Sequence, residues 1–458
     1  MSHVFGERYM QYLAAFLVSI LTISTGIASA WTSPILPMIT SPNSPIGVTL
    51  TMEESSWITS VSLLGYIVGN SGVGKLLDIL GRKKLLLISA VPIVFTWMMI
   101  LFAKNVSLLI IARFISGIAH VVPTVGSVIY IGEIAEADIR GKLGMFNLLM
   151  TELGQLFITV VGNYCSYQTT AIAAAAIPII FVVTFFWMPE SPYYHMRKGE
   201  VDNARKCLAK LRPNLDVEKE IKDIQYNVEK EMKNNSNFLE LFRKPNYRKT
   251  VLIILGLKTL QQMSGNLAIN SYMKTIFNQA STGLNSSESS IIATGITIPT
   301  MIVASYIIDC SGRKPLYYVS TLGLSLALFC EATYFYLQNI EKQDMTSLSW
   351  MPLSGVFFFN IFRVIGVQPI PYILTSELFP INIKGHAVSV TLMYSSMLGF
   401  FVSLGFPYVT ELWDMYGGFL IFAIFCFLGF FFVLIFVPET KAKSLGDIQE
   451  DIEEQCDK

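Results

Sequence analysis

One short charged signature occurs twice in this chain, about half a protein apart. The run DILGRK at positions 78–83 returns as DCSGRK at positions 309–314, displaced by 231 residues in a chain of 458. Two further features repeat in the same order at offsets of 244 and 249: an acid seven residues before a base (Glu133 and Arg140, then Glu377 and Lys384) and the runs PES at 189–191 and PET at 438–440. Such ordered repetition predicts two homologous halves.

The surrounding sequence is that of a membrane protein. Charged residues make up only 14% of the chain and hydrophobic residues 52%, and the stretch 153–189 contains no charge. A helix needs about 20 mostly apolar residues to cross a bilayer. The pattern predicts an all-α fold with twelve membrane-spanning helices in two six-helix bundles, at about 11–34, 57–77, 85–103, 107–131, 142–164, 169–188, 250–278, 288–308, 316–338, 350–376, 385–408 and 414–437.

Basic residues are distributed unevenly between the predicted loops. They gather after the even-numbered helices, most densely in 189–249, where fourteen Lys and Arg accompany ten Asp and Glu. Loops on the opposite side carry few, so the positive-inside rule predicts cytoplasmic termini. We expect the protein to lie in the plasma membrane. We expect an N-terminal bundle at 1–188, a cytoplasmic linker with short helices at 189–249, a C-terminal bundle at 250–437 and a cytoplasmic tail at 438–458.

Several other classes of protein are disfavoured. The six cysteines and four histidines show no metal-ligand spacing, no catalytic constellation is present, and no basic stripe suggests nucleic acid. The run GNSGVGK at 69–75 matches seven positions of a phosphate-binding loop, but Leu76 stands where Ser or Thr is needed. Gly65 and Gly69, four residues apart, instead predict close helix packing. We expect no cofactor, metal or obligate protein partner.

A family resemblance connects these motifs. Along almost its whole length the chain resembles the sugar porters of the major facilitator superfamily, and the segment 29–34 with Ser56-Trp57 is most similar to the insect facilitated trehalose transporters. The matching motifs are GRK at 81–83 and 312–314, RFISG at 113–117, YIGE at 130–133, RG at 140–141, PESP at 189–192, QQMSG at 261–265, PIPY at 369–372, SELFP at 376–380 and PETK at 438–441.

The charged motifs lie where predicted helices meet the cytoplasm. The resemblance implies a gate network that pairs Arg82 with Glu133, Arg140 with Glu190, Arg313 with Glu377 and Lys384 with Glu439, joined by Asp78, Asp309 and Arg113. An exposed pair contributes only about 0–1 kcal/mol. Pairs that break together can still bias which face of a carrier is closed. The alternative is ordinary solvated loop charge that obeys the positive-inside rule.

A transported sugar needs hydrogen-bonding groups and an aromatic wall at mid-membrane depth. Gln261, Gln262, Asn266 and Asn270 in the seventh predicted helix supply the polar groups, and Ser264-Gly265 lets that helix break. Tyr372, beside two prolines, supplies a ring. Thr297 and Gln155 are weaker candidates. The alternative role for all of these polar residues is helix–helix hydrogen bonding.

This chain departs from the family pattern at several positions of the expected substrate region, and some of these departures add charge. Lys258 precedes the glutamine pair, Glu152 lies within the fifth predicted helix, and Arg363 lies near the middle of the tenth. A charge at that depth costs at least about 2.5–3.5 kcal/mol unless it meets water or a partner. We include Glu152 and Arg363 in the substrate region and hypothesise that they pair.

Three functions remain open from the sequence. The first is facilitative transport of a neutral sugar, trehalose or a hexose such as glucose, by alternating access around a midplane site. The second is a uniport or proton-coupled carrier of a charged or modified solute, with Glu152 as the proton carrier. The third is a transport-inactive sensor. The first predicted helix carries no Asp or Glu, which favours uniport. The predicted partners are a small sugar and the lipid bilayer.

Overall fold

The computed structural model describes residues 2–136, 138–212, 217–233, 240–243, 245–280, 283–379 and 381–440. All regular secondary structure within these residues is helical. The predicted tail beyond residue 440 lies outside them.

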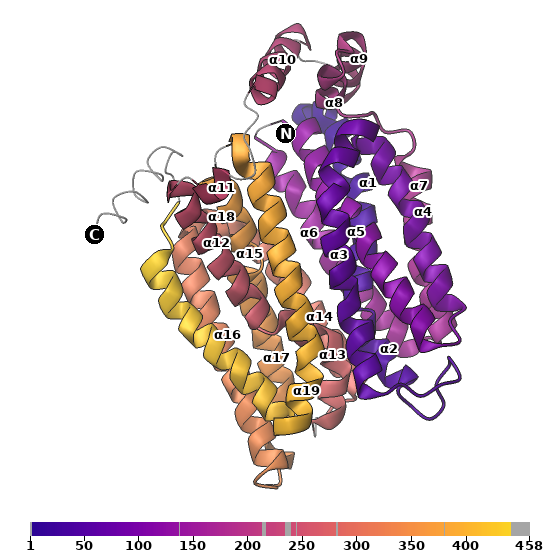
Figure 1. Ribbon diagram of the computed structural model, residues 1–458, viewed down its shortest axis with the longest axis vertical. Helices are drawn as coiled ribbons and strands as arrows, with labels where there is room; N and C mark the ends of the chain where they lie inside the picture. The colour runs from indigo at the N-terminus through magenta and orange to yellow at the C-terminus, as the bar shows by residue number, and fades with distance from the viewer. Residues whose placement is uncertain are drawn as a thin grey trace. The chain divides into compact units, whose positions relative to one another are not determined.

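Seven helices form the first part of the chain: α1 (Ser2–Ala30), α2 (Thr32–Ile39), α3 (Met52–Leu80), α4 (Arg82–Leu101), α5 (Val106–Ile134), α6 (Arg140–Tyr164) and α7 (Tyr167–Phe185). Four short helices follow: α8 (Pro192–Arg197), α9 (Val201–Leu211), α10 (Val217–Lys233) and α11 (Glu240–Arg243). The remainder comprises α12 (Pro245–Met263), α13 (Asn266–Gln279), α14 (Ser286–Gly295), α15 (Thr297–Ser311), α16 (Arg313–Asn339), η1 (Thr346–Leu348), α17 (Met351–Phe362), η2 (Arg363–Val367), α18 (Ile370–Leu378) and α19 (Ile381–Phe436) (Figure 1).

These helices account for the twelve predicted spans. Within the residues that the structure describes, ten helical stretches are long and apolar enough to cross a membrane. The last of them, Ile383–Phe436, contains two spans, because Asp414 has a non-helical backbone with φ of 61° and separates them. The seventh span is absent from the ten because Gly265, with φ of 76°, divides it into α12 and α13. The break at Ser264-Gly265 that the sequence predicted is therefore present.

The chain forms two compact units. Unit 1 contains residues 1–29, 65–161 and 165–235, and unit 2 contains 30–64, 162–164 and 236–458. In unit 2, α2 packs against α13, and the Trp57 and Phe400 rings lie 5.9 Å apart. Residues 30–64 of the first half of the sequence therefore belong to the same unit as the helices of the second half. The predicted division at 189–249 stays a prediction.

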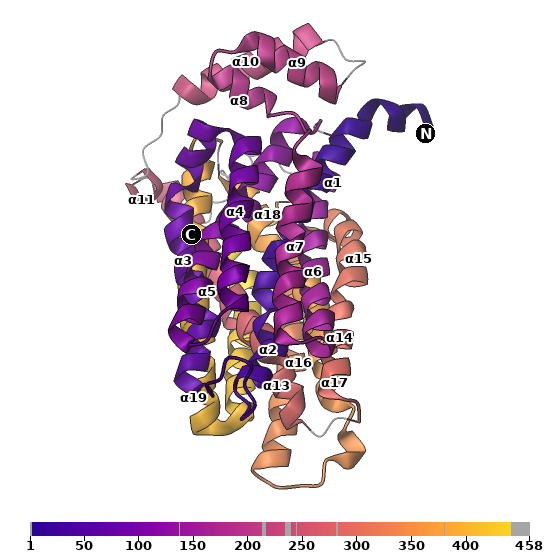
Figure 2. The ribbon, with the colours of Figure 1, turned by 90° about the vertical axis from the view of Figure 1, so that its right-hand side faces the viewer.

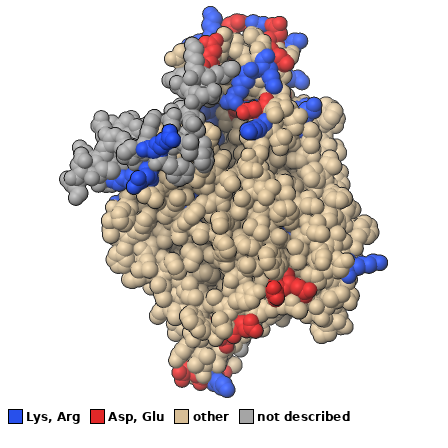
Figure 3. All heavy atoms as spheres, viewed as in Figure 1, with Lys and Arg blue, Asp and Glu red and all other residues tan. Residues whose placement is uncertain are grey.

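In unit 1, α8, α9 and α10 lie beyond the ends of α4 and α7 (Figure 2). They share a small apolar core that includes Met196, Leu208 and Ile224. On the face drawn in Figure 3, charged side chains gather over these short helices, whereas the spanning helices show almost none. The central segment thus folds as amphipathic surface helices with a core of their own.

Glycines allow helices of unit 1 to approach closely. A Cβ on Gly65 would lie 2.0 Å from the carbonyl oxygen of Phe114, and one on Gly69 would lie 2.8 Å from that of Ile118. Both glycines therefore place the backbone of α3 against that of α5, as the sequence predicted. The phosphate-loop-like run 69–75 lies inside α3, with no strand before it.

We predict that Gly65→Val lowers the thermal stability of the detergent-solubilised protein by an amount typical of overpacking, roughly 1–3 kcal/mol. The matched control is Gly72→Val in the same helix, where an added Cβ meets nothing within 4 Å. Thermal unfolding followed by size-exclusion chromatography compares the two variants. Equal loss in both would mean that helix propensity, and not the α3–α5 contact, sets the requirement for glycine.

Candidate functional site

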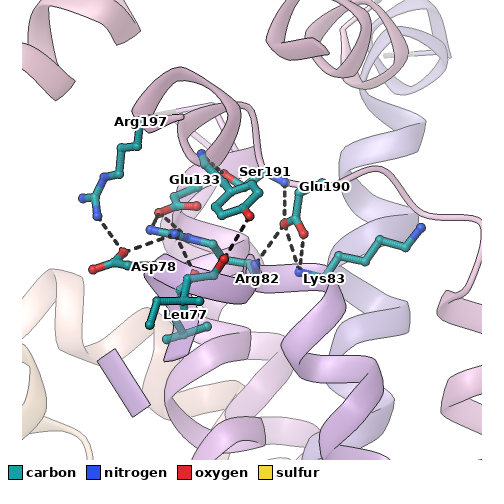
Figure 4. A network of polar contacts seen from close by, with 10 residues as sticks. Leu77, Asp78, Arg82, Lys83, Glu133, Glu190, Ser191 and Arg197 are labelled. Carbon is teal, nitrogen blue, oxygen red and sulfur yellow. Dashed lines mark hydrogen bonds and ion pairs between the residues drawn. The ribbon is translucent and has the colours of Figure 1, made fainter. Parts of the chain in front are cut away.

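The first charge network lies in unit 1 at the junction of α3 and α4. The buried Arg82 guanidinium donates to Glu133 Oε1 from Nη2 at 2.8 Å and from Nε at 3.1 Å. Its Nη1 lies 3.4 Å from Asp78 Oδ1, which also accepts from Arg197 at 2.8 Å (Figure 4). The arginine therefore connects α3, α4 and α5.

Glu190 organises the same junction through backbone groups. Its carboxylate accepts hydrogen bonds from the backbone N–H groups of Arg82 (3.0 Å), Lys83 (2.9 Å) and Ser191 (2.9 Å). The first N–H groups of a helix lack partners within the helix and carry a partial positive charge, so a carboxylate is favoured there. Gly81 precedes α4 with φ of 91°, and a Cβ on it would lie 2.6 Å from Glu190 Oε2. Glycine is thus required both by the backbone and by the carboxylate.

Unit 2 contains a second copy of this arrangement. Arg313 donates to Glu377 Oε1 at 3.0 Å, and Glu439 accepts from the backbone N–H groups of Arg313 and Lys314, both at 3.1 Å. Gly312 has φ of 88°, and a Cβ there would lie 2.8 Å from Glu439 Oε2. The repeated sequence signatures therefore fold into repeated structures, each within its own unit.

Other predicted members of the network lie elsewhere. Arg140 donates to the carbonyl oxygen of Ala135. The Glu190 carboxylate instead accepts from backbone N–H groups at the start of α4. The predicted Arg140–Glu190 pair is therefore wrong. Lys384 lies within electrostatic reach of Glu377, and its predicted pair with Glu439 stays a prediction. The side chain of Asp309 is outside the described residues.

Arg113 does not belong to the network around Arg82. It is buried in α5, twenty residues before Glu133, which corresponds to about 30 Å along a helix. Its Nη1 donates to the carbonyl oxygen of Ala28 in α1 at 2.7 Å. Its position in the structure indicates a tie between α1 and α5.

A second ionic cluster in unit 1 was not predicted from the sequence. Glu136, directly after α5, lies 2.7 Å from Arg8 and accepts from Gln11 at 2.8 Å. Arg212, at the end of α9, lies 3.9 Å from the same carboxylate and donates to the carbonyl oxygen of Ile134. Burial lowers the pKa of Arg212 although the Glu136 charge opposes this shift. The cluster ties the end of α9 to α1 and α5.

In unit 2, Gln261 holds an irregular part of the tenth span. The five residues of η2 are π-helical, and Pro371 has no N–H to donate to the carbonyl oxygen of Val367 one turn earlier. Gln261 Nε2 supplies the missing donor: it donates to the carbonyl oxygen of Val367 at 3.2 Å and to that of Gln368 at 3.0 Å. The amide thus satisfies carbonyl groups that a proline-interrupted helix leaves open.

Two buried cations adjoin this segment. Lys258 Nζ donates to Gln261 Oε1 at 3.0 Å and lies 3.3 Å from the centre of the Tyr372 ring. Tyr372 is half exposed, so one side of its ring faces the cation and the side chain remains accessible. Arg363 donates to Gln368 Oε1 at 2.8 Å. A polar chain therefore runs from Lys258 through Gln261 and the backbone of Gln368 to Arg363.

The remaining candidates in unit 2 differ in accessibility. Gln262 is half-buried and donates to Ser395 at 2.7 Å, and the half-buried Asn270 donates to Asn266 at 2.9 Å. Thr297 is buried and donates to the carbonyl oxygen of Thr294, which is a role within the helix backbone. The three amides keep polar capacity for a ligand, whereas Thr297 does not.

In unit 1, Glu152 and Gln155 are buried on α6. Glu152 and Arg363 belong to different units, and their pairing stays a prediction. A second buried carboxyl group within a span, Glu331, was not predicted from the sequence. Glu331 is 1% exposed in α16, where a Cβ on Gly355 would lie 2.1 Å from its Oε1. It is the only charged residue in the predicted span 316–338, which was a usable signal.

Comparison with known proteins gives consistent matches. The family profile described as "Sugar (and other) transporter" matches residues 14–452. Facilitated trehalose transporters of Bombyx mori and Apis mellifera ligustica are each 33% identical, over 96% of this chain and over 86% and 88% of their own lengths. The facilitated trehalose transporter of Drosophila virilis is 32% identical over 445 residues, but the chain spans only 48% of that relative.

Two solved structures share the fold at 22% identity. One is the major facilitator superfamily proton:xylose symporter XylE bound to 6-bromo-6-deoxy-D-glucose, with a TM-score of 0.76 over 97% of this chain and 99% of that chain. The other is a partially occluded inward open conformation of the xylose transporter XylE from E. coli, with a TM-score of 0.78 over 96% and 100%.

We predict that Gln261→Ala destabilises the protein more than Gln262→Ala does. The first change leaves the Val367 carbonyl without a donor and Lys258 without its acceptor, and an unsatisfied buried group costs roughly 1–3 kcal/mol. The Gln262→Ala change removes one hydrogen bond to the Ser395 hydroxyl. This hydroxyl can rotate toward another partner, so the loss of stability is smaller. Thermal unfolding in detergent measures both. A smaller loss for Gln261→Ala would contradict the structural role of its amide.

Proposed function

The chain belongs to the family of sugar (and other) transporters and has the twelve-helix major facilitator fold, and we propose that it carries a neutral sugar across the membrane by alternating access. Trehalose and hexoses such as glucose are the proposed substrates. The protein acts as a carrier and not as an enzyme. We place it in the plasma membrane, and the distribution of Lys and Arg favours cytoplasmic termini.

The paired charge networks carry this proposal. Each fixes the junction between two spanning helices through an arginine, a buried or half-buried carboxylate and a carboxylate at a helix N-terminus. Two equivalent clusters on homologous repeats are suited to bias two bundles in a correlated way. A single enzyme active site has no need of such duplication.

For recognition of the sugar, we propose the half-buried amides of Gln262, Asn266 and Asn270 together with the Tyr372 ring. These groups combine donors, acceptors and an aromatic face, which a polyhydroxylated ring requires. The broken helix at Gly265 supports the assignment, because discontinuous helices commonly line transport sites. Gln261 acts by holding η2 and Lys258 in place.

A second candidate is a carrier of an anionic or modified solute. The observation that favours it is the pair of buried cations in unit 2, Lys258 and Arg363, next to the exposed Tyr372 ring. Positive charges in a low-dielectric interior would attract an anionic group of a solute more strongly than they would in water. Glu152, buried in α6, would serve in a proton-coupled form, and a transport-inactive sensor is the third candidate.

Uptake into proteoliposomes distinguishes these candidates. We expect radiolabelled trehalose or glucose to equilibrate without accumulating, with or without a pH gradient. Glucuronate and glucose 6-phosphate, as anionic probes, should not enter. Accumulation of sugar only when the outside is acidified would replace uniport by proton coupling, and selective entry of the anionic probes would favour the second candidate. If no compound of the panel is transported, the result would favour the third candidate, a transport-inactive sensor.

We predict that Arg82→Ala and Arg313→Ala, alone and together, shift the carrier toward states open to the cytoplasm. Each substitution leaves a carboxylate without its guanidinium, Glu133 in one unit and Glu377 in the other. Reactivity of introduced cysteines with a membrane-impermeant reagent from the cytoplasmic side should rise, while the amount of protein at the surface stays near normal.

The control for this experiment is Arg205→Ala. Arg205 lies on α9 in exposed pairs with Asp202 and Glu218, and such pairs contribute little, about 0–1 kcal/mol. Its removal should leave cysteine reactivity unchanged. Unaltered reactivity in the Arg82/Arg313 double variant as well would remove the gating role of the two networks.

A further inference from the structure

A basic hollow in unit 1 borders the first charge network, and its lysine side chains have no part in the proposed transport mechanism. It has a volume of about 530 Å³ and lies where the end of α7 meets α9 and the first turn of α4. Its charged lining consists of Lys83, Lys206, Lys210 and Glu190. Figure 2 shows α9 beyond the ends of α4 and α7, which places the hollow at the boundary between spanning and surface helices.

The hollow carries a surplus of positive charge. Glu190 is the only acid in its lining, and its oxygens already accept from the N–H groups of Arg82, Lys83 and Ser191. Lys206 and Lys210, one helical turn apart on α9, have no hydrogen bond or ion pair within the described part of the chain. Burial raises the pKa of the Cys207 thiol between them, so this group stays neutral. Three lysines against one occupied carboxylate favour an anion.

Aromatic side chains border the hollow on the membrane side. Phe186 and Trp187 directly follow the spanning helix α7, line the hollow, and are 60% and 67% exposed. Lys83 Nζ lies 5.7 Å from the centre of the Phe186 ring, and Figure 4 shows the Lys83 side chain extending past Glu190, away from the Arg82 network. Exposed tryptophan at a helix end is typical of the level of lipid headgroups.

We propose that this hollow binds the phosphate-bearing headgroup of an anionic membrane lipid. Lys83, Lys206 and Lys210 contact the phosphate, and Phe186 and Trp187 contact the glycerol and the first part of the acyl chains. Lysines next to spanning helices attract anionic lipids, and basic pockets at such boundaries hold their headgroups. A soluble phosphate would use the lysines equally well but would leave the exposed aromatic rings without a role.

The test uses the full-length protein in detergent and tryptophan fluorescence. Phosphatidylglycerol, phosphatidylinositol phosphate and phosphatidylcholine, each with brominated acyl chains, are titrated separately, because bromine quenches a nearby indole. We expect the two anionic lipids, but not phosphatidylcholine, to quench saturably at low concentration. Trp187→Phe should remove this saturable component while the other five tryptophans remain.

Substitution of the lysines decides whether the hollow is the site. Lys206→Gln with Lys210→Gln should weaken binding of the anionic lipids by about 10- to 30-fold, whereas Lys206→Arg with Lys210→Arg should retain it. The matched control is Lys219→Gln with Lys222→Gln on the neighbouring α10, which removes the same charge outside the hollow and should change affinity by less than about two-fold.

Three outcomes would overturn the proposal. Equal affinity in the Lys206/Lys210 and Lys219/Lys222 variants would show that only the summed charge of the segment matters. Equal quenching by phosphatidylcholine would show that the headgroup charge is not recognised. Displacement of the bound lipid by inorganic phosphate at similar concentration would assign the hollow to a free anion. The measurement does not depend on which solute the protein transports.

Discussion

The attraction between a carboxylate and the first N–H groups of a spanning helix is the interaction on which the charged ends of this protein depend. Glu190 meets the start of α4, and Glu439 meets the start of α16. Hydrogen bonds to a charged group contribute roughly 1.5–3 kcal/mol each, more than an exposed ion pair such as Arg197–Asp78, at about 0–1 kcal/mol. The carboxylate–backbone contacts therefore fix the geometry, and the arginine pairs extend it to the neighbouring helices.

Both copies require a glycine for the same two reasons. Gly81 and Gly312 have positive φ values of 91° and 88°, where a side chain is strained. A Cβ at either position would also meet the carboxylate it faces. The glycine, the carboxylate and the first N–H groups of the helix thus form one structural motif, which occurs twice. The basic hollow adjoins the motif at Gly81 through Lys83 and Glu190, so an anionic headgroup would bind directly beside this motif.

The substrate region of unit 2 depends on a different constraint, the missing N–H of proline. Pro371 leaves the Val367 carbonyl open, Gln261 fills the gap, and the same amide holds Lys258 beneath Tyr372. Gln261, which the sequence suggested as a sugar ligand, therefore uses its amide N–H groups to bind backbone carbonyl groups. The half-buried Gln262, Asn266 and Asn270 are better placed to exchange partners with a solute.

The sequence by itself determined the spans, the two repeated signatures, the break at Gly265 and the close approach at Gly65, because each follows from local composition or from a residue type with a fixed backbone preference. The pairs Arg82–Glu133 and Arg313–Glu377 were predicted through the family resemblance, and both contacts are present. Only the tertiary structure decided which carbonyl groups accept from Gln261, that Glu190 accepts from the backbone of α4, and that Arg113 donates to the carbonyl oxygen of Ala28. These outcomes depend on the depth and rotation at which distant helices meet, which spacing along one chain does not encode.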